Sequence, residues 1–448
     1  MCGIMGYVGK KQAMPIILEG LKKLNYRGYD SAGISTLEDI FHVFKDSGDI
    51  SDLEQIMPQL PGFLGIGHTR WATHGGVTKE NAHPHLSGNG RIAVVHNGVI
   101  ENYRKLRSSF EAEGSVFRSE TDTEVIAFLI EKYYNGNLEE ATRKAVTKLK
   151  GSYAIAVMCT DEKEKIVTAR NGSPLIIGVG DGEYYAASDI PALLDYTNKV
   201  IFLDDYEIAT LASDQVTIMD LKGRHIEKNP EMISWTSEDV QKAGYPHYML
   251  KEIHEQPFVI RQATQHRISE LDGWVYFEEL ENHEWFFPQL EHITILASGT
   301  SFYAGMTGKY AIEQITRIPV SLQLAVEYQP LPMVDDKTLT IAITQSGETA
   351  DTITAMKKAK AQGSKVLTIC NAPGSTASRL SDWTILGNAG PEIGVAATKT
   401  FTSQLTLLYL LAIFIGRRKH LLAVNPAMGY LRDLKALSQH LQILLSST

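Results

Sequence analysis

Cysteine is scarce in this 448-residue sequence and occurs only as Cys2, Cys159 and Cys370. Three cysteines without a CxxC pair form neither a disulfide framework nor a zinc site. The sequence also lacks histidine, cysteine and carboxylate residues at metal-ligand spacing, and it has no GxxxxGK[ST] loop. We therefore expect no metal, no organic cofactor and no nucleoside triphosphate.

Positive charge and long apolar runs are also in short supply. The 43 lysines and arginines are outnumbered by 52 aspartates and glutamates, and no basic stripe carries interleaved aromatic residues, which argues against nucleic acid. No basic segment followed by an apolar stretch opens the chain, so we expect no signal peptide. The apolar run at 405–415 is shorter than the roughly 20 residues that span a bilayer. We expect a cytoplasmic protein without a membrane partner.

The pattern of apolar residues divides the chain into segments. A chain of 448 residues is long enough for two or three domains. Residues 1–225 mix short apolar strands with helices. The pattern of apolar and charged residues changes over 226–285, where residues 247–268 predict a charged amphipathic helix. We therefore place an inter-domain linker there. Residues 286–425 repeat a strand–loop–helix unit, which predicts a parallel sheet flanked by helices. Residues 426–448 predict a helix that leads out of this domain.

Two polar loops in the second half follow strands directly and begin helices. They are SGTS at 298–301 and TQSGETAD at 344–351. The exposed N–H groups at a helix N-terminus favour an anion, and ligands of open α/β sheets bind beyond the carboxyl ends of the strands. Serine, threonine and glycine are also ordinary turn residues, but two such loops in consecutive units favour a phosphate. Further donors are the hydroxyls of Ser301, Thr344, Ser346 and Thr349.

The motifs ASGTS, QSGETAD and PEIGVAATKTFTSQ resemble the sugar isomerase (SIS) domain of the glutamine–fructose-6-phosphate aminotransferase family, which makes glucosamine 6-phosphate. The likeness extends over nearly the whole chain. It implies that fructose 6-phosphate is a substrate, and that it is contacted by Ser301, Gln345, Ser346, Thr349 and Val395. Thr344 stands where relatives often have serine and keeps the hydroxyl.

The first half resembles the N-terminal-nucleophile (Ntn) glutaminase domain of the same family. The matching stretches are MCGIMGYVG, YRGYDSAGI, HTRWATHGGVTKENAHPH, HNGVIEN and SETDTEVI. The resemblance implies a four-layer αββα sandwich, whereas the pattern of residues alone indicates only mixed α and β structure. We therefore expect an αββα glutaminase domain followed by one α/β SIS domain with a parallel sheet.

The position of Cys2 suits nucleophilic attack on the side-chain amide of glutamine. A small second residue permits removal of Met1, which would leave a thiol and a free α-amine on Cys2. Their ordinary pKa values, about 8.5 and about 7.7–8.0, are closely matched. The amine can therefore act as general base, and no Cys–His pair is required. The resemblance assigns the oxyanion hole to the side chain of Asn97 and the backbone N–H of Gly98.

Glutamine also carries an α-carboxylate and an α-ammonium group that the site must bind. Arg70 is suited to a bidentate grip on the carboxylate, and Asp122 to the ammonium group. The resemblance gives them these roles and makes Trp71 the gate of an ammonia path. His74 and His85 match pocket positions, for which a structural hydrogen bond is an equal alternative.

The resemblance also implies a second SIS domain, which opens and isomerises the sugar. No further strand–loop–helix units follow residue 425, so we expect this domain to be lacking. The chain is then expected to hydrolyse glutamine but to make little or no glucosamine 6-phosphate. It would act as a homodimer or paired with a separate SIS-containing chain.

Outside the sites, we expect Arg27 to hold the N-terminal strand in place, and Cys159 and Cys370 to lie in the core.

Three other functions compete with this interpretation. Another Ntn amidotransferase, such as amidophosphoribosyltransferase, would need a phosphoribosyl-diphosphate loop with paired acidic residues, which QSGETAD is not. A non-catalytic sugar-phosphate-binding SIS module is a second alternative. A degenerate, inactive product is the third, although every glutaminase position that can be matched holds the expected residue.

Overall fold

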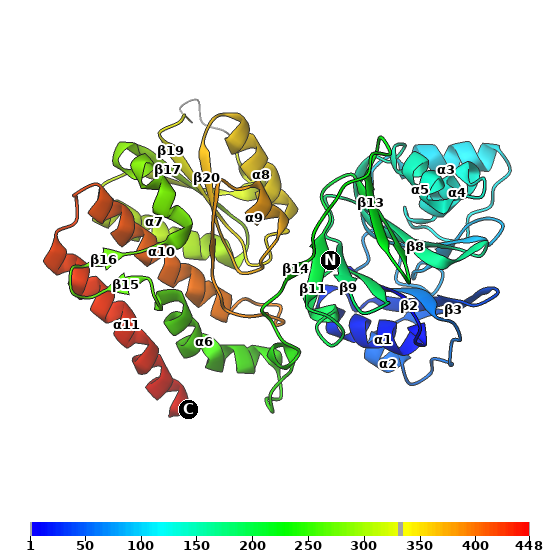
Figure 1. Cartoon of the computed structure of the whole chain (residues 1–448), viewed down its shortest axis with the longest axis horizontal. Helices are drawn as coiled ribbons and strands as arrows, with labels where there is room; N and C mark the ends of the chain where they lie inside the picture. The colour runs from blue at the N-terminus through cyan, green and yellow to red at the C-terminus, as the bar shows by residue number, and fades with distance from the viewer. Residues whose placement is uncertain (1, 330–334, 448) are drawn as a thin grey trace. The chain divides into compact units, whose positions relative to one another are not determined.

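A computed structural model describes residues 2–329 and 335–447 and divides into two compact units, Met1–Ser237 and Glu238–Thr448. Figure 1 shows the helices and strands of each unit. The segment expected to be a linker, 226–285, is divided between the units. Its helix α6 (Tyr248–Thr264) is part of the second unit, because its apolar face is buried against α10 and α11.

The first unit contains two antiparallel sheets. In sheet order, the eight-stranded sheet consists of β14 (Glu231–Met232), β11 (Lys199–Phe202), β9 (Ile176–Val179), β10 (Tyr184–Ala187), β1 (Gly3–Val8), β4 (Leu64–Arg70), β2 (Ser31–Leu37) and β3 (Phe41–Ser47). The six-stranded sheet consists of β13 (Val216–Asp220), β12 (Glu207–Ala212), β8 (Glu162–Asn171), β7 (Gly151–Cys159), β6 (Ile92–Ile100) and β5 (His85–Leu86). The helices are α1 (Ala13–Lys23), α2 (Ile50–Leu53), α3 (Tyr103–Ala112), α4 (Glu124–Tyr133) and α5 (Leu138–Val146).

The two sheets pack face to face, and helices cover their outer faces. Helix α1 packs on β1, β2 and β4, whereas α4 and α5 pack on β6 and β8. The alternation of β1 explains this arrangement, because successive side chains of a strand point to opposite faces. Ile4 and Val8 lie in the core between the sheets, while Met5 and Tyr7 lie in the core beneath α1. These layers form the αββα sandwich that was expected.

The second unit is built on a five-stranded sheet in which every neighbouring pair is parallel. In sheet order its strands are β18 (Val320–Leu324), β17 (His292–Ala297), β19 (Thr338–Ile343), β20 (Lys365–Cys370) and β21 (Trp383–Leu386). The helices are α6, α7 (Thr300–Thr316), α8 (Ala350–Ala361), α9 (Thr376–Leu380), α10 (Lys399–Arg418) and α11 (Val424–Ser446). A two-stranded sheet joins β15 (Ile268–Ser269) to β16 (Trp274–Val275). This unit confirms the α/β class and the parallel sheet.

Short 3-10 helices complete the two units. They are η1 (Asn25–Arg27), η2 (Ile190–Ala192), η3 (Glu238–Val240), η4 (Glu278–Gln289) and η5 (Ala325–Glu327). The core positions of the free cysteines agree with expectation, since Cys159 lies buried in β7 and Cys370 lies buried at the end of β20.

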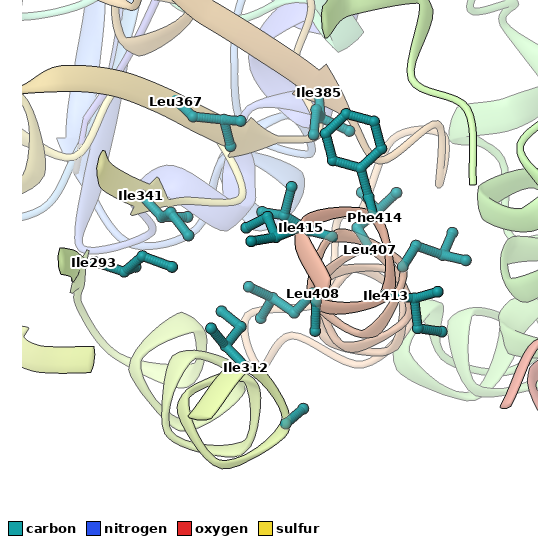
Figure 2. Packing of buried hydrophobic residues seen from close by; sticks show 14 of the residues in the cluster. Ile293, Ile312, Ile341, Leu367, Ile385, Leu407, Leu408, Ile413, Phe414 and Ile415 are labelled. Atoms are coloured by element: carbon teal, nitrogen blue, oxygen red, sulfur yellow. The ribbon is translucent and has the colours of Figure 1, made fainter. Parts of the chain in front are cut away.

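Helix α10 is the central apolar element of the second unit. Figure 2 shows Leu408 and Ile415 of this helix close to Ile312 of α7 and Ile341 of β19. The helix is longer than the apolar run at 405–415, and by length and composition alone it could cross a membrane. However, 78% of its most apolar window is buried inside the unit, as in the core helix of a soluble protein.

Replacing Leu411 by alanine should destabilise the second unit. Leu411 is completely buried in α10, so the change leaves a cavity that costs about 2–5 kcal/mol in the free energy of unfolding. Leu421, which is 50% exposed, is the control, and its replacement should change stability by about 0.5 kcal/mol or less. Urea unfolding measures both variants. Equal losses of stability would contradict the packing described here.

Candidate functional site

Cys2 lies half-buried immediately before β1 and forms hydrogen bonds with Trp71 and Asn97. Its Sγ accepts a hydrogen bond from the backbone N–H of Trp71 at 3.2 Å, and its carbonyl oxygen accepts one from Asn97 Nδ2 at 3.0 Å. Burial raises the pKa of the Cys2 thiol, while the hydrogen bond to Trp71 and the charge of Arg70 oppose that rise. The structure thus brings together a thiol, an amide donor and a nearby cation.

The strand that carries Cys2 is held in place by Ser188 and Arg27. The Ser188 hydroxyl accepts the N–H of Ile4 at 2.7 Å, and the Ser188 N–H donates to the Ile4 carbonyl at 3.1 Å. Arg27, buried and ion-paired with Asp189 at 3.3 Å, donates to the Ser188 carbonyl at 3.2 Å. These contacts confirm the structural role expected for Arg27.

Gly98 follows Asn97 in β6 and occupies a backbone conformation that favours glycine. Its φ is +129°, and an added Cβ would lie 2.1 Å from the carbonyl oxygen of Ser152 on the neighbouring strand β7. A side chain would therefore suffer both backbone strain and a collision with main-chain atoms. The tight approach of β6 to β7 fixes the backbone next to Asn97.

Arg70 ends β4 and supports the loop that follows it. The buried guanidinium donates to the carbonyl oxygens of His74 and Gly76, the latter at 3.1 Å. Burial lowers the pKa of Arg70, and the charges of Cys2 and Asp122 oppose that effect. Asp122, also buried, accepts the N–H of Ile100 at 2.7 Å. Arg70 thus lies within electrostatic reach of both the Cys2 thiol and Asp122.

The remaining predicted glutamine residues differ in their surroundings. Trp71 is 44% exposed, and its ring packs edge-on against Tyr29. The ring of His74 packs edge-on against Tyr103. His85 is buried and its Nε2 lies 3.1 Å from the Thr121 hydroxyl, a contact that favours the structural alternative for this residue.

A cluster of buried histidines behind Asn97 was not predicted from the sequence, apart from His85. His68 and His83 stack with ring centroids 4.0 Å apart, and His83 packs edge-on against His85. His96 donates its backbone N–H to Nδ1 of His83 at 3.3 Å. Burial lowers the pKa of all four histidines, and for His68 the value falls to about 3. The apolar strands that carry His68 and His96 signal burial, but no pattern in the sequence signals that the four histidines contact one another.

In the second unit the two predicted polar loops lie at one edge of the sheet. Strands β17 and β19 are parallel neighbours, so Ser301 and the loop 344–349 both follow carboxyl ends at that edge. The Thr344 hydroxyl accepts the N–H of Gly347 at 3.2 Å and lies 3.4 Å from the Thr349 hydroxyl. Gly347 has φ +68°, and an added Cβ would lie 2.0 Å from the hydroxyl of Ser375.

The other members of the predicted sugar-phosphate set belong to the same loops or to the loop after β21. The backbone carbonyl of Gln345 accepts a hydrogen bond from the N–H of Asn371 at 3.1 Å. The hydroxyl of Ser346 accepts one from the N–H of Glu348 at 3.2 Å. Val395 lies in the loop between β21 and α10 and is 88% exposed. Within the described residues, no hydrogen bond joins Val395 to the loop 344–349.

The loop that carries Val395 is anchored by a buried carboxylate that the sequence did not reveal. Oε1 of Glu252 on α6 accepts the N–H groups of Ile393 at 2.6 Å and Gly394 at 3.0 Å. Burial raises the pKa of Glu252, and these two hydrogen bonds oppose that rise. Across the described ranges, no group of three or more His, Cys, Asp or Glu side chains is arranged to hold a metal ion.

Replacing Gly98 by alanine should destabilise the first unit by roughly 3 kcal/mol or more, since strain and collision add. Gly114 is the matched control, because its φ is +90° and nothing lies within 4 Å of an added Cβ. Its replacement should cost only about 1 kcal/mol of backbone strain. Urea unfolding measures the difference. A Gly98→Ala variant no less stable than Gly114→Ala would disprove the close approach of β6 and β7.

The first unit should also lose stability in mild acid. The pKa of His68 is about 3 in the folded protein and about 6.5 when unfolded, so the unfolded state binds more protons as the pH falls. The stability contributed by neutral His68 is complete above pH 6.5 and decreases as the pH falls toward 3. Between pH 7 and pH 5 the loss is about 2 kcal/mol for this residue. Urea unfolding over this pH range measures it, and a His68→Leu variant with the same slope would contradict the prediction.

Comparison with protein families supports the division into two functional parts. A model of the glutamine amidotransferase domain matches residues 68–195, and a model of the SIS domain matches residues 287–414. The first segment contains Arg70, Asn97 and Asp122, and the second contains the loops of the candidate sugar-phosphate site. The solved C-terminal domain of glucosamine-fructose-6-phosphate aminotransferase from Francisella tularensis is 39% identical, with a TM-score of 0.41, over 44% of this chain and 55% of that one.

Curated relatives match the whole length of the chain. A glutamine–fructose-6-phosphate aminotransferase (isomerizing) of Caldanaerobacter subterraneus subsp. tengcongensis is 47% identical over 100% of this chain and 74% of its own length. A protein of the same name from Thermococcus kodakarensis is 49% identical over 93% of this chain and 69% of its own length. The chain therefore belongs to the glutamine–fructose-6-phosphate aminotransferase (isomerizing) family.

Proposed function

We propose that the chain hydrolyses glutamine at Cys2 and passes the ammonia to fructose 6-phosphate, forming glucosamine 6-phosphate and glutamate. The observation that carries this proposal is the pair of hydrogen bonds that place Cys2 between the Trp71 N–H and the Asn97 amide. The 47% identity to a family member over the whole chain supports the same reaction. Residues 1–225 would carry the glutaminase reaction, and residues 286–425 would bind the sugar phosphate.

The glutaminase step follows from the groups around Cys2. After removal of Met1, the α-amine of Cys2 takes the thiol proton, and Sγ attacks the amide carbon of glutamine. The nitrogen leaves as ammonia with the transferred proton, and water hydrolyses the resulting thioester to glutamate. The oxyanion of each tetrahedral intermediate would be stabilised by Asn97 Nδ2 and the backbone N–H of Gly98. The balance requires only glutamine and water.

The charged ends of glutamine would be bound by Arg70 and Asp122, both of which are buried. Arg70 keeps part of its guanidinium on the loop carbonyls, and we assign its remaining donors to the α-carboxylate. Asp122 would accept hydrogen bonds from the α-ammonium group. Trp71, whose ring is partly exposed, would cover the site and gate the ammonia path. His74 would line the pocket. The hydrogen bond of His85 to Thr121 favours a structural role for His85 instead.

The sugar phosphate would bind at the edge of the parallel sheet in the second unit. Hydroxyls and backbone N–H groups at the starts of α7 and α8 suit a phosphate, because unpaired N–H groups and the helix dipole point at it. Glu252 supports the proposal by fixing the loop that carries Val395. The residues assigned to the sugar phosphate are Ser301, Thr344, Gln345, Ser346, Thr349 and Val395.

We further propose that the polypeptide of residues 1–448, assayed by itself, makes little or no glucosamine 6-phosphate. The SIS model matches one segment, 287–414, whereas the resemblance assigns sugar opening and isomerisation to a second SIS domain. The polypeptide would form a homodimer or pair with a separate SIS-containing chain, and only the second kind of pairing would complete the synthesis. The three free cysteines and the buried helix α10 support a cytoplasmic setting.

Replacing Cys2 by alanine should abolish glutamate production, because no other group in the proposed site can form the thioester. The Cys159→Ala variant is the matched control, since Cys159 is buried in β7 and takes no part in the chemistry. Glutamate and glucosamine 6-phosphate are measured with and without fructose 6-phosphate. Glutamate from Cys2→Ala at the wild-type rate would refute the proposed nucleophile, and amino sugar made at a rate comparable to glutamate would refute the limited synthesis.

A further inference from the structure

His68 occupies the strand that leads to the candidate glutaminase site but has no part in the reaction described above. It lies in β4, two residues before Arg70, and none of its surface is exposed. Its Nε2 lies 3.0 Å from Oδ1 of Asn97 and 3.0 Å from the carbonyl oxygen of His96. Both neighbours of this nitrogen are therefore oxygen atoms that accept hydrogen bonds.

These two contacts determine which nitrogen of His68 carries the proton. Two oxygen acceptors require a donor at Nε2, since an unprotonated nitrogen there would face two lone pairs. Nδ1 is buried and makes no hydrogen bond among the described residues, which is consistent with an unprotonated nitrogen. Burial lowers the pKa of His68 to about 3, so the ring is neutral at physiological pH. His68 is thus a neutral imidazole with its single N–H directed at Asn97.

The N–H of His68 distinguishes the two orientations of the Asn97 amide. With Oδ1 toward His68, Nδ2 donates to the carbonyl oxygen of Cys2 at 3.0 Å and to the hydroxyl of Ser188 at 2.8 Å. Rotating the amide by half a turn would place its NH₂ against the N–H of His68 and its oxygen against the oxygen of Cys2. Donor would then face donor and acceptor would face acceptor, and buried polar groups would lose their partners.

The ring of His68 is itself held rigidly. It stacks on His83 with ring centroids 4.0 Å apart and an interplanar angle of 23°. The His68 backbone pairs with Ile4 of β1 on one side and with Gly33 of β2 on the other. Because β1 begins next to Cys2, one framework positions both the nucleophile and the imidazole that orients the amide.

We propose that His68 is a positioning residue for glutamine hydrolysis, whose Nε2–H holds Oδ1 of Asn97 and thereby keeps Nδ2 on the side of Cys2. When the tetrahedral intermediate forms beside Cys2, one Nδ2 hydrogen would turn from the Cys2 carbonyl or the Ser188 hydroxyl to the oxyanion. The inference rests on the proposed role of Asn97. His68 does not contact the reacting atoms, so it acts only through the amide. Its loss should lower the rate of the chemical step and leave the binding of glutamine little changed.

Three substitutions of His68 separate positioning from folding. His68→Leu removes the donor, and His68→Asn keeps a polar side chain that is too short to reach Asn97. His68→Gln places an amide N–H near the position of Nε2. Leu211→Ala is the control for lost stability, since Leu211 lies in β12 and is completely buried between the sheets.

The experiment measures kcat and KM for glutamine hydrolysis by the 448-residue polypeptide. The concentration of folded sites is determined from the alkylation of Cys2 by iodoacetamide that excess glutamine prevents, since this reaction forms no oxyanion and an unfolded chain would not be protected. For His68→Leu and His68→Asn we expect kcat per reactive thiol to fall 10- to 100-fold, with KM within about threefold of the wild type. His68→Gln should recover kcat to within about fivefold, and Leu211→Ala should keep the wild-type kcat per reactive thiol.

A double-mutant cycle with Asn97→Ala provides the second readout. If His68 acts only through Asn97, adding His68→Leu to Asn97→Ala should lower kcat no further. Independent losses, or an unchanged kcat in both His68→Leu and His68→Asn, would overturn the inference. Failure of the proposed function can be distinguished from failure of this inference, because the wild-type protein would then produce no glutamate. If His68→Leu does not fold, His68→Asn and His68→Gln decide the outcome.

Discussion

The candidate site of the first unit depends on the hydrogen bonds of the Asn97 side-chain amide. One end of the amide accepts from His68, and the other donates to the Cys2 carbonyl and to Ser188, the residue that secures β1. Buried polar groups must be paired, so each of these residues constrains the orientation of the next. The neutral state of His68 belongs to the same constraint, because burial excludes its charged form. A network that holds the strand of the nucleophile also orients the donor beside it.

The second unit must also hold the loops of its candidate site in place, but it does so with different contacts. Its parallel sheet brings successive loops to one edge, and glycine at position 347 leaves room for the side chain of Ser375. The loop after β21 is anchored by a carboxylate on α6, which accepts two of its backbone N–H groups. This explains why residues 248–264, whose charged pattern suggested a linker, form part of the unit. The apolar residues of α6 pack against the core, while Glu252 faces a loop of the candidate sugar-phosphate site.

Much of this organisation was predictable from the sequence, because the decisive signals are local. The strand–loop–helix repeats predicted the parallel sheet. The motifs around Cys2 and Gln345 indicated the family and its candidate residues. The four histidines were not predictable as a cluster, because they come from three separate strands and a loop that only the fold brings together. The same limit applies to Glu252. Its pairing with backbone N–H groups more than a hundred residues away leaves no local pattern, so the membership of α6 in the second unit was not predictable.

The central claim is that an N-terminal cysteine is the nucleophile, and the most direct measurement is the mass of the protein after reaction with an electrophilic glutamine analogue. The account predicts a polypeptide that has lost Met1 and carries one label, located on Cys2, with labelling prevented by excess glutamine. Cys159 and Cys370 should remain unlabelled, because both are buried. A label on either of these residues, or full glutaminase activity in protein that retains Met1, would contradict the account.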